Sequence, residues 1–193
     1  MSRVRVGLLF GSFNPVHVGH LILAEHFATR TDLAEVWLVV SPHNPFKEAA
    51  SLLLPAERLR LVELALAGNP RLRAESVEFG LPRPSYTLVT LDALRRQHPI
   101  LDFVLLMGAD NFLGLPRWQE SARVLAEVDI YVYPRPGIVL PDLVAFPRVQ
   151  LMAAPLLDIS ATYIRESLRA GRSIRYLVPS AVEMALLTSS VRG

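Results

Sequence analysis

The segment GSFNPVHVGH, residues 11–20, contains two side chains well suited to catalysis, His17 and His20. It follows an apolar, strand-like run and leads into the helix-like stretch LILAEHFA. A spacing of three residues puts both imidazoles on one side of the first helical turn, where the N-terminus offers partial positive charge and free N–H groups that suit phosphate. Imidazoles placed there can hydrogen-bond phosphate oxygens and gain positive charge as a transition state gains negative charge. We therefore predict a phosphate site in which both histidines are catalytic.

Other uses of this segment are weaker or plainer. Zinc binding is the weaker one, because the spacing differs from HExxH and His26 would face away from His20 on a helix. The glycine spacing matches neither the GxGxxG dinucleotide fingerprint nor a P-loop. In the plainer alternative, His20 is a partly buried packing residue and Gly11 only serves the turn. The position of the segment after the first strand, where ligands collect in open parallel sheets, favours the phosphate site.

Two cations are candidates for binding the same phosphates. Lys47, the only lysine among the 20 basic residues, ends the segment SPHNPFK. Its prolines hold the loop extended, and lysine can reach a phosphate as a mobile point charge, although an ordinary solvated lysine is the alternative. Arg165 lies about one turn into the helix that ISATYIRESL predicts, within reach of a phosphate at that N-terminus. Ser160 and Thr162 are helix caps in the plain structural interpretation.

Polar and aromatic residues follow later apolar runs. Asp110 comes directly after such a run, at the edge where ligands bind, and can accept hydrogen bonds from ribose hydroxyls or amines. It can also simply cap the next turn. Trp118 offers a flat face for an aromatic ring, although a lone tryptophan is more often part of a core. In PSYTLVTLDAL, either Ser85 or Thr87 is suited to cap a helix.

The elements that must position these residues alternate along the chain. Apolar runs rich in Val, Ile and Leu predict strands, and segments of helical period predict helices between them. Uninterrupted apolar strands that alternate with helices are typical of a parallel sheet covered on both faces. We therefore expect an α/β fold, a Rossmann-like doubly wound parallel sheet with helices on both faces. The expected strands are 4–10, 36–40, 73–78, 103–107, 130–133 and 149–152, and the expected helices are 20–29, 55–67, 86–97, 119–126, 161–169 and 180–187.

The length of the chain predicts a single domain, 1–193. Half of its 193 residues are hydrophobic (51%), which is enough for a sizeable core. No internal repeat or low-complexity segment interrupts it, and the proline-rich stretch 134–147 is expected to be a longer loop. We expect the C-terminal helical part, about 158–193, to pack on this domain.

Composition and charge exclude several classes of protein. The net charge of +2 comes without a dense basic run, which argues against a nucleic-acid partner. The longest uncharged stretch, 6–24, contains Asn14, Pro15, His17 and His20, which a bilayer core would reject. Cysteine is absent, and the N-terminus runs directly into an apolar strand-like segment without a signal sequence. We expect a cytoplasmic protein with no membrane partner; its oligomeric state is not readable from the sequence.

Five motifs and one shorter segment, PRPG, together resemble one enzyme family. GSFNPVHVGH resembles the T/HxGH signature of the nucleotidyltransferase superfamily, and in its GSFNPxHxGH form it is similar to nicotinate-nucleotide adenylyltransferases. SPHNPFK resembles a proline-rich loop that ends in PHK, PSYTLVTL an SYT…TL segment, and MGADNFLGLPRW a GxDN…W pattern. ISATYIR is similar to ISSTxIR, and PRPG resembles an RPG segment. Two departures are the insertion of residues 44–46 between His43 and Lys47, and Ala161 in place of the second serine.

The resemblance assigns roles to residues of this sequence. It implies that His17 and His20 contact the ATP phosphates and stabilise the pentacovalent transition state, and that Lys47 and Arg165 bind phosphate as well. The ATP-binding residues that it implies are Gly11, Ser12, Phe13, Asp110, Arg135, Ser160 and Thr162. For the pyridine nucleotide it implies Asn14, Tyr86, Thr87 and Trp118, with the tryptophan stacked on the nicotinate ring.

The function implied by the resemblance is transfer of an adenylyl group from ATP to nicotinate mononucleotide. The substrates are then two small molecules, and we expect Mg²⁺ to arrive on the ATP phosphates and not in a protein metal site, because paired carboxylates are lacking. Within the same class, the acceptor can instead be nicotinamide mononucleotide or phosphopantetheine. A non-catalytic module that senses ATP or NAD is the alternative from another class. An NAD-dependent oxidoreductase is disfavoured by the missing GxGxxG.

Overall fold

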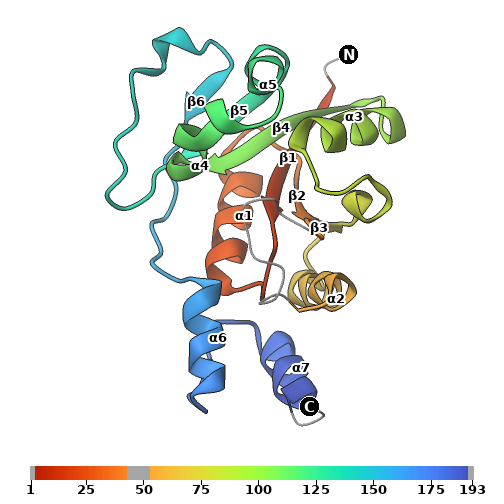
Figure 1. Cartoon of the computed structure of the whole chain (residues 1–193), viewed down its shortest axis with the longest axis vertical. Coiled ribbons are helices and arrows are strands. Elements are labelled where there is room, and N and C mark those ends of the chain that lie inside the picture. The colour runs from red at the N-terminus through yellow and green to blue at the C-terminus, as the bar shows by residue number, and fades with distance from the viewer. Residues whose placement is uncertain (1–2, 43–52, 191–193) are drawn as a thin grey trace.

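The fold is built on one sheet of six parallel strands in the order β3-β2-β1-β4-β5-β6 (Figure 1). The computed structural model of the chain describes residues 3–42 and 53–190. This strand order is that of the Rossmann fold, which confirms the expected fold class. The strands are β1 Val4–Gly11, β2 Glu35–Val40, β3 Leu72–Glu75, β4 Leu101–Gly108, β5 Asp129–Tyr133 and β6 Val149–Leu151.

Helices cover both faces of the sheet because the central strands are apolar on both sides. Leu8 and Leu9 of β1 are neighbours in sequence, yet they belong to two separate buried clusters on opposite faces. The cluster around Leu9 includes residues of α1 and α2, and the cluster around Leu8 includes residues of α3, α4 and α5. The helices are α1 Val18–Arg30, α2 Pro55–Leu66, α3 Thr87–Gln97, α4 Ala109–Gly114, α5 Ser121–Glu127, α6 Ala161–Arg169 and α7 Ser180–Ser190.

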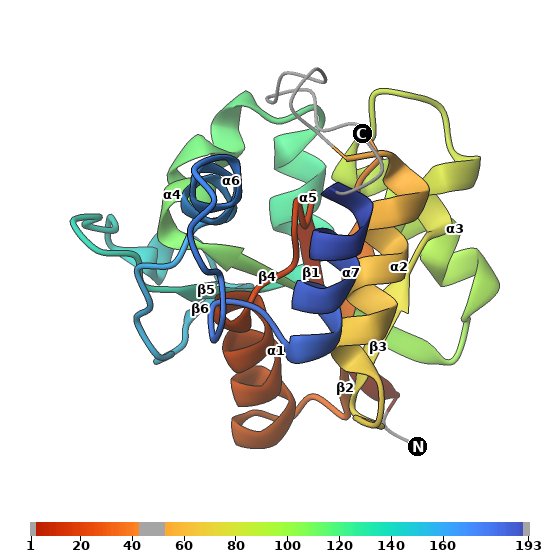
Figure 2. The same cartoon turned by 90° about the horizontal axis from the view of Figure 1, so that it is seen from below.

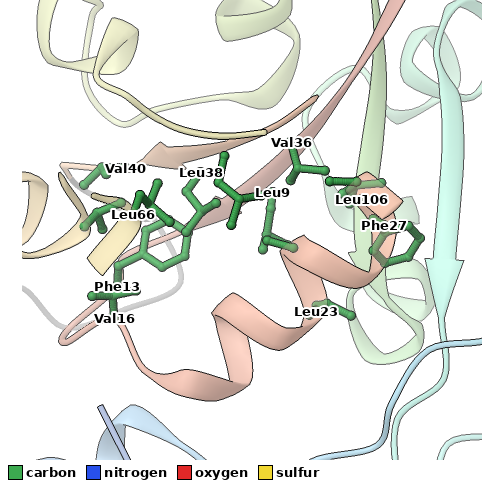
Figure 3. Packing of buried hydrophobic residues seen from close by; sticks show 14 of the residues in the cluster. Leu9, Phe13, Val16, Leu23, Phe27, Val36, Leu38, Val40, Leu66 and Leu106 are labelled. Atoms are coloured by element: carbon green, nitrogen blue, oxygen red, sulfur yellow. The ribbon is translucent and has the colours of Figure 1, made fainter. Parts of the chain in front are cut away.

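The face formed by α1 and α2 contains a packed core that reaches the first turn of the chain. In the close view of Figure 3, Leu9 of the sheet lies above α1 on the side of Leu23, and Leu106 lies beside Phe27 of the same helix. At the other end of this layer, Phe13 from the turn after β1 joins the same cluster and is 2% exposed. The turn that carries the predicted chemistry is therefore anchored directly in the core.

The last two helices lie at one end of the molecule. Figure 2, seen from below, shows α7 alongside α2. Ile164 of α6 and Val182 of α7 are fully buried and belong to the cluster that includes α1 and α2. None of the described helices is long and apolar enough to cross a membrane.

Element boundaries differ from the expectation mainly where chain direction changes. The strand expected over 73–78 ends at Glu75, and a 3₁₀ helix, Val77–Gly80, follows it. The short helix α4 was not expected, because six residues carry too little periodicity to be recognised. Residues 134–147 form the predicted longer loop, with one 3₁₀ turn at Leu143–Ala145. All six expected strands and six expected helices are present, with ends shifted by up to three residues.

The topology places a binding crevice at the carboxyl end of the sheet between β1 and β4. The connection from β1 leads to β2 on one side, whereas β4 pairs with β1 on the other side. At such a switch point the loops after the two strands diverge and leave room for a ligand. The turn after β1 and the segment after β4 carry the predicted residues His17 and Asp110.

Candidate active site

The turn after β1 is held by tight packing between backbone and rings. Phe13 has a left-handed backbone (φ 46), which turns the chain sharply after the strand. A Cβ added to Gly11 would lie 2.8 Å from the Phe13 ring, so only glycine lets the ring pack under the strand end. The ring also contacts that of His20 edge to face, with centroids 5.0 Å apart. The local sequence GSF therefore forms the packed turn against which the ring of His20 lies.

The two histidines stack against each other at the start of α1. Their ring centroids are 3.6 Å apart with an interplanar angle of 26°, and the backbone N–H of His17 donates to His20 Nδ1 over 3.3 Å. Gly19 lies between them in sequence, and a Cβ there would come within 3.0 Å of His17 Nδ1. The three-residue spacing thus brings both imidazoles to one side of the helix start, and the intervening glycine lets them stack.

The His17 imidazole is held neutral by its surroundings. Its side chain is 5% exposed, and burial lowers its pKa to about 4, with the nearby charge of Arg135 contributing in the same direction. Before substrate binds, His17 therefore acts as a neutral hydrogen-bond donor or acceptor near pH 7. An anion placed against it would favour the protonated form.

Arg165 reaches this turn from far along the chain. Its guanidinium Nη1 donates to the backbone oxygen of Asn14 over 2.8 Å, and Nη2 donates to the hydroxyl of Thr162 over 3.2 Å. The hydroxyl of Ser160 caps α6 by accepting from the backbone N–H of Tyr163 over 3.2 Å, as the plain structural interpretation expected. The N-terminus of α6 and the start of α1 thereby face one cavity.

That first cavity has a volume of about 620 Å³ and gathers most of the predicted ATP-binding set. Asp110 and Arg135 line its other wall, where their side chains form an exposed ion pair of 3.5 Å. Gly108 permits this pair, because a Cβ there would lie 2.4 Å from Asp110 Oδ1. The predicted residues in the wall are Gly11, Ser12, Phe13, Asn14, His17, His20, Asp110, Arg135, Ser160, Thr162 and Arg165.

A second cavity of about 670 Å³ adjoins the first and is lined by the predicted pyridine-binding residues Tyr86, Thr87 and Trp118. Trp118 is half-buried at the edge of the core, so part of its ring faces the cavity. Asn14, expected at the pyridine nucleotide, lies in the first cavity and is absent from the described lining of the second. Its side-chain oxygen accepts from the backbone N–H of Leu53 over 3.0 Å.

The capping alternative for the second cavity does not hold. The N-cap of α3 is Tyr86, and no side chain makes a cap hydrogen bond there. Neither Ser85 nor Thr87 therefore serves as the cap, and the first-turn N–H groups of α3 remain available beside the cavity. Asp110 likewise lies in the first turn of α4, whose N-cap is Gly108.

The two cavities share wall residues. Among the described side chains, every buried polar atom that lacks a hydrogen-bond partner belongs to a residue lining one of the two cavities. Phe10, Gly11, Asp110 and Asn111 line both cavities. Buried polar atoms normally have hydrogen-bond partners, so such atoms gathered in cavities indicate positions that a ligand completes. Those without a partner are Ser12 Oγ, His17 Nδ1 and Arg165 Nε in the first cavity, and Glu78 Oε2 and Ser85 Oγ in the second.

Two buried charged residues at this site were missed by the sequence interpretation. Glu78 is 2% exposed, lines the second cavity and accepts from the hydroxyl of Thr90 over 2.9 Å. Burial raises its pKa, and nearby hydroxyls such as that of Thr90 act against that rise. Arg58, on α2, is fully buried. Charged residues are common on helices and in turns, so their burial has no local sequence signal.

Lys47 lies outside the described residues, as does the whole altered loop segment 43–52. Among the residues that are described, no group of three or more His, Cys, Asp or Glu side chains is placed to hold a metal ion. Asp110 is the acidic residue in the described lining of the first cavity.

The comparisons with known proteins agree with this geometry. A sequence model of the family described as cytidylyltransferase-like matches residues 8–167. Among solved structures, the nicotinic acid mononucleotide adenylyltransferase of Plasmodium falciparum complexed with NaAD superposes with a TM-score of 0.81 at 16% identity, covering 97% of both chains. At that identity the likeness shows the fold. Fold, paired cavities and family match together define a nucleotidyltransferase of Rossmann-like architecture.

Relatives at higher identity narrow this class. A protein of Cytophaga hutchinsonii is 48% identical over 185 residues, which cover 96% of both chains. One of Bacteroides fragilis is 46% identical over 182 residues, covering 94% of this chain and 90% of the relative. Both carry the name "Probable nicotinate-nucleotide adenylyltransferase". The chain belongs to the nicotinate-nucleotide adenylyltransferase family.

Proposed function

We propose that this chain transfers the adenylyl group of ATP to nicotinate mononucleotide, which yields nicotinate adenine dinucleotide and pyrophosphate for NAD biosynthesis. The observation that carries the proposal is the pair of adjoining cavities with shared walls at Gly11 and Asp110. Two nucleotides bound side by side there would meet at these shared walls, with the stacked histidines on the side of the first cavity. The names of relatives up to 48% identical support this choice of substrates.

The reaction joins two anions. An oxygen of the acceptor 5′-phosphate attacks the α-phosphorus of ATP, a new P–O bond forms, and the bond to the β-phosphate breaks to release pyrophosphate. The second pKa of a phosphate monoester is about 6, so the attacking oxygen is deprotonated at neutral pH and needs no protein base. Two unit charges 4 Å apart repel by about 4 kcal/mol at an effective dielectric of 20. The protein must therefore position the phosphates and offset their charge.

The first cavity supplies groups for that task. We assign His17 and His20 to the phosphates, with His17 starting neutral because of its burial and gaining a proton as negative charge develops against it. Arg165 is already charged, and its orphaned Nε points to a further contact with phosphate. The hydroxyl of Ser12 is the third orphaned donor in this wall.

The ends of ATP are placed by the remaining residues of the first cavity. Asp110 stands between the two cavities, where its carboxylate can accept from ribose hydroxyls. Arg135 lies on the wall next to Asp110, and we place the adenine of ATP beside it. Gly11 and Phe13 contribute backbone and shape, and Ser160 and Thr162 belong to the N-terminal turn of α6, which suits phosphate.

The second cavity holds the acceptor in this proposal. Trp118 offers a partly exposed ring on which the pyridine can stack. Tyr86 and Thr87 stand at the uncapped N-terminus of α3, and its N–H groups favour the negative carboxylate of nicotinate over a neutral amide. Asn14 lies in the turn after β1 and lines only the first cavity, so we propose that it affects the acceptor indirectly, through the position of that turn. Lys47 is proposed to bind phosphate on the basis of its position in the sequence.

Magnesium fits this site as a partner of the ATP phosphates. Among the described residues, one carboxylate lines the first cavity, that of Asp110. Mg²⁺ is commonly held by one or two carboxylates, substrate phosphates and water. When bound, it neutralises charge on the triphosphate. We further propose that residues 1–193 act as one domain, since Arg165 of the C-terminal part belongs to the cavity wall. The proposed role in NAD biosynthesis is the reason for placing the protein in the cytoplasm.

Pyrophosphate release with Mg-ATP and either nicotinate or nicotinamide mononucleotide tests the function. The expected result is a strong preference for the acid. Replacing His20→Ala should lower the rate about 100- to 1,000-fold, as for the loss of one donor to a transition state. His26→Ala is the matched control, because His26 lies on the same helix and contacts the backbone oxygen of Ala153 away from the cavities. No release with either acceptor contradicts the proposal.

A further inference from the structure

Arg58 on α2 is a buried cation whose contacts converge on the turn after β1. It is 0% exposed, although arginine is rarely found fully buried. Its guanidinium donates to the backbone oxygens of Ser12, Ser41, Pro42 and Leu53. The bonds to Ser41 and Pro42 measure 2.8 and 2.9 Å, and the bond to Leu53 measures 3.1 Å.

These four carbonyls belong to three segments that do not otherwise form one element. Ser12 lies in the turn after β1, Ser41 and Pro42 follow β2, and Leu53 precedes α2. The backbone N–H of Ser41 donates to Gly11 over 2.9 Å, which continues the same junction. Because the guanidinium is planar and rigid, four bonds to one group fix the relative positions of all three segments.

The charge of Arg58 is stabilised by the dipoles of the backbone carbonyls to which it donates. Among residues 3–42 and 53–190, no carboxylate lies within salt-bridge distance of it. Burial of a charge is costly, and burial lowers the pKa of Arg58 accordingly. Retention of a guanidinium at this cost points to a requirement at the junction that a neutral side chain does not meet.

The turn that Arg58 holds is also the wall of the first cavity. Ser12 is 4% exposed and lines the cavity; its backbone oxygen accepts from Arg58, and its buried hydroxyl has no hydrogen-bond partner. Phe13 follows with its left-handed backbone, and His17, the N-cap of α1, comes four residues later. A shift at Ser12 would therefore move the groups that meet the phosphates, whereas Arg58 itself is not in the described lining of either cavity.

We propose that Arg58 is a positioning residue for adenylyl transfer, which holds the turn after β1 against the end of β2 and the start of α2 so that Ser12 and His17 face the phosphates. This inference rests on the proposed function, because it assigns the cavity wall to phosphate binding. Arg58 acts through backbone carbonyls and does not touch substrate.

The test compares Arg58→Met, which removes charge and donors at similar length, with Arg58→Lys, which keeps the charge and up to three donors. Arg71→Met is the matched control, since Arg71 also donates to a backbone oxygen, that of Ala28 over 3.0 Å, away from both cavities. Each variant is measured well below its own Tm, with folding checked by near-UV circular dichroism. The readouts are kcat and KM for both substrates per folded protein, and ATP binding by calorimetry.

Misplacement of catalytic groups by a distant change can cost about 100-fold in rate. We expect Arg58→Met to lower kcat about 100-fold at saturating substrates, Arg58→Lys to recover part of that loss, and Arg71→Met to keep kcat within threefold of the parent. A folded Arg58→Met protein with kcat within threefold of the parent overturns the proposal. If Arg58→Met does not fold, a full kcat in folded Arg58→Lys, despite its altered bonding geometry, overturns it as well.

Failure of the proposed function is distinguishable from failure of this inference. An inactive parent protein that binds ATP by calorimetry contradicts adenylyl transfer and leaves ATP binding as the readout for Arg58. In that case, a folded Arg58→Met protein that binds ATP as tightly as the parent overturns the positioning role, and weakened binding supports it.

Discussion

The burial of His17 predicts a specific loss of stability in acid. Its pKa is about 4 in the folded protein against 6.5 for the free side chain, because burial disfavours the charged ring. A histidine with a lowered folded pKa binds its proton more readily when unfolded. The stability that the folded protein owes to a neutral His17 is therefore fully present above about pH 6.5, and it is lost as the pH falls toward 4.

The magnitude follows from the size of the shift. The difference between 6.5 and about 4 is about 2.5 units, and each unit corresponds to about 1.36 kcal/mol. By pH 4, where the folded His17 is half protonated, the loss reaches about 3 kcal/mol. That is a large share of the 5–15 kcal/mol by which folded domains of this kind are typically stable.

Urea denaturation of the ligand-free protein at several values between pH 7.5 and 4 measures this effect. Other groups titrate over the same range, so the quantity of interest is the difference between the parent and His17→Asn, in which they cancel. We expect the free energy of unfolding of the parent to fall by about 3 kcal/mol more than that of His17→Asn. His26→Asn should follow the parent. Parallel curves for the parent and His17→Asn would refute the assignment of a buried, neutral imidazole.

Three further predictions concern the cavity walls. Gly19→Ala places a Cβ within 3.0 Å of the His17 ring, so we expect kcat to fall at least 10-fold while Tm changes by a few degrees; a kcat equal to the parent contradicts the stacking argument. Glu78 has a raised folded pKa, so its contribution to stability is full below its ordinary value of 4.5 and is lost as the pH rises through the folded pKa. Melting curves at pH 4.5 and 7.5 should therefore show Glu78→Gln gaining Tm relative to the parent at the higher pH, and an equal difference at both values would argue against it. Trp118→Leu should raise KM for nicotinate mononucleotide about 10-fold through the loss of ring stacking and leave KM for ATP unchanged, whereas equal effects on both would remove the tryptophan from the acceptor site.

The positions of the residues in short motifs were largely predictable. Strand periodicity and the placement of GSFNPVHVGH after β1 were enough to put His17 and His20 at the ligand edge of a parallel sheet. The segments around Asp110 and Arg165 were likewise identified, and both residues lie in the first cavity. The positions of these residues could be predicted because each depends on nearby residues of the same element, whereas their roles in binding and catalysis stay predictions.

Other features depend on partners that are remote in sequence. The contact between Arg165 and Asn14 joins residues 151 positions apart. The motif implied that Asn14 lies at the pyridine nucleotide, but the conformation of the turn after β1 places it in the first cavity. Arg58 and Glu78 give no sign in the sequence of being buried. Whether a charged side chain on a helix or in a turn faces water or the interior depends on which segments pack against it.

The sequence by itself determined the fold class, the family and the position of the two histidines at the end of β1, because hydrophobic period and motif spacing are local properties. Only the tertiary structure decided how the site is held. The order of the strands brings β4 beside β1, and with it Asp110 between two cavities. The docking of α6 and α2 on the turn adds Arg165 and Arg58. These positions result from long-range packing, which no single window of residues encodes.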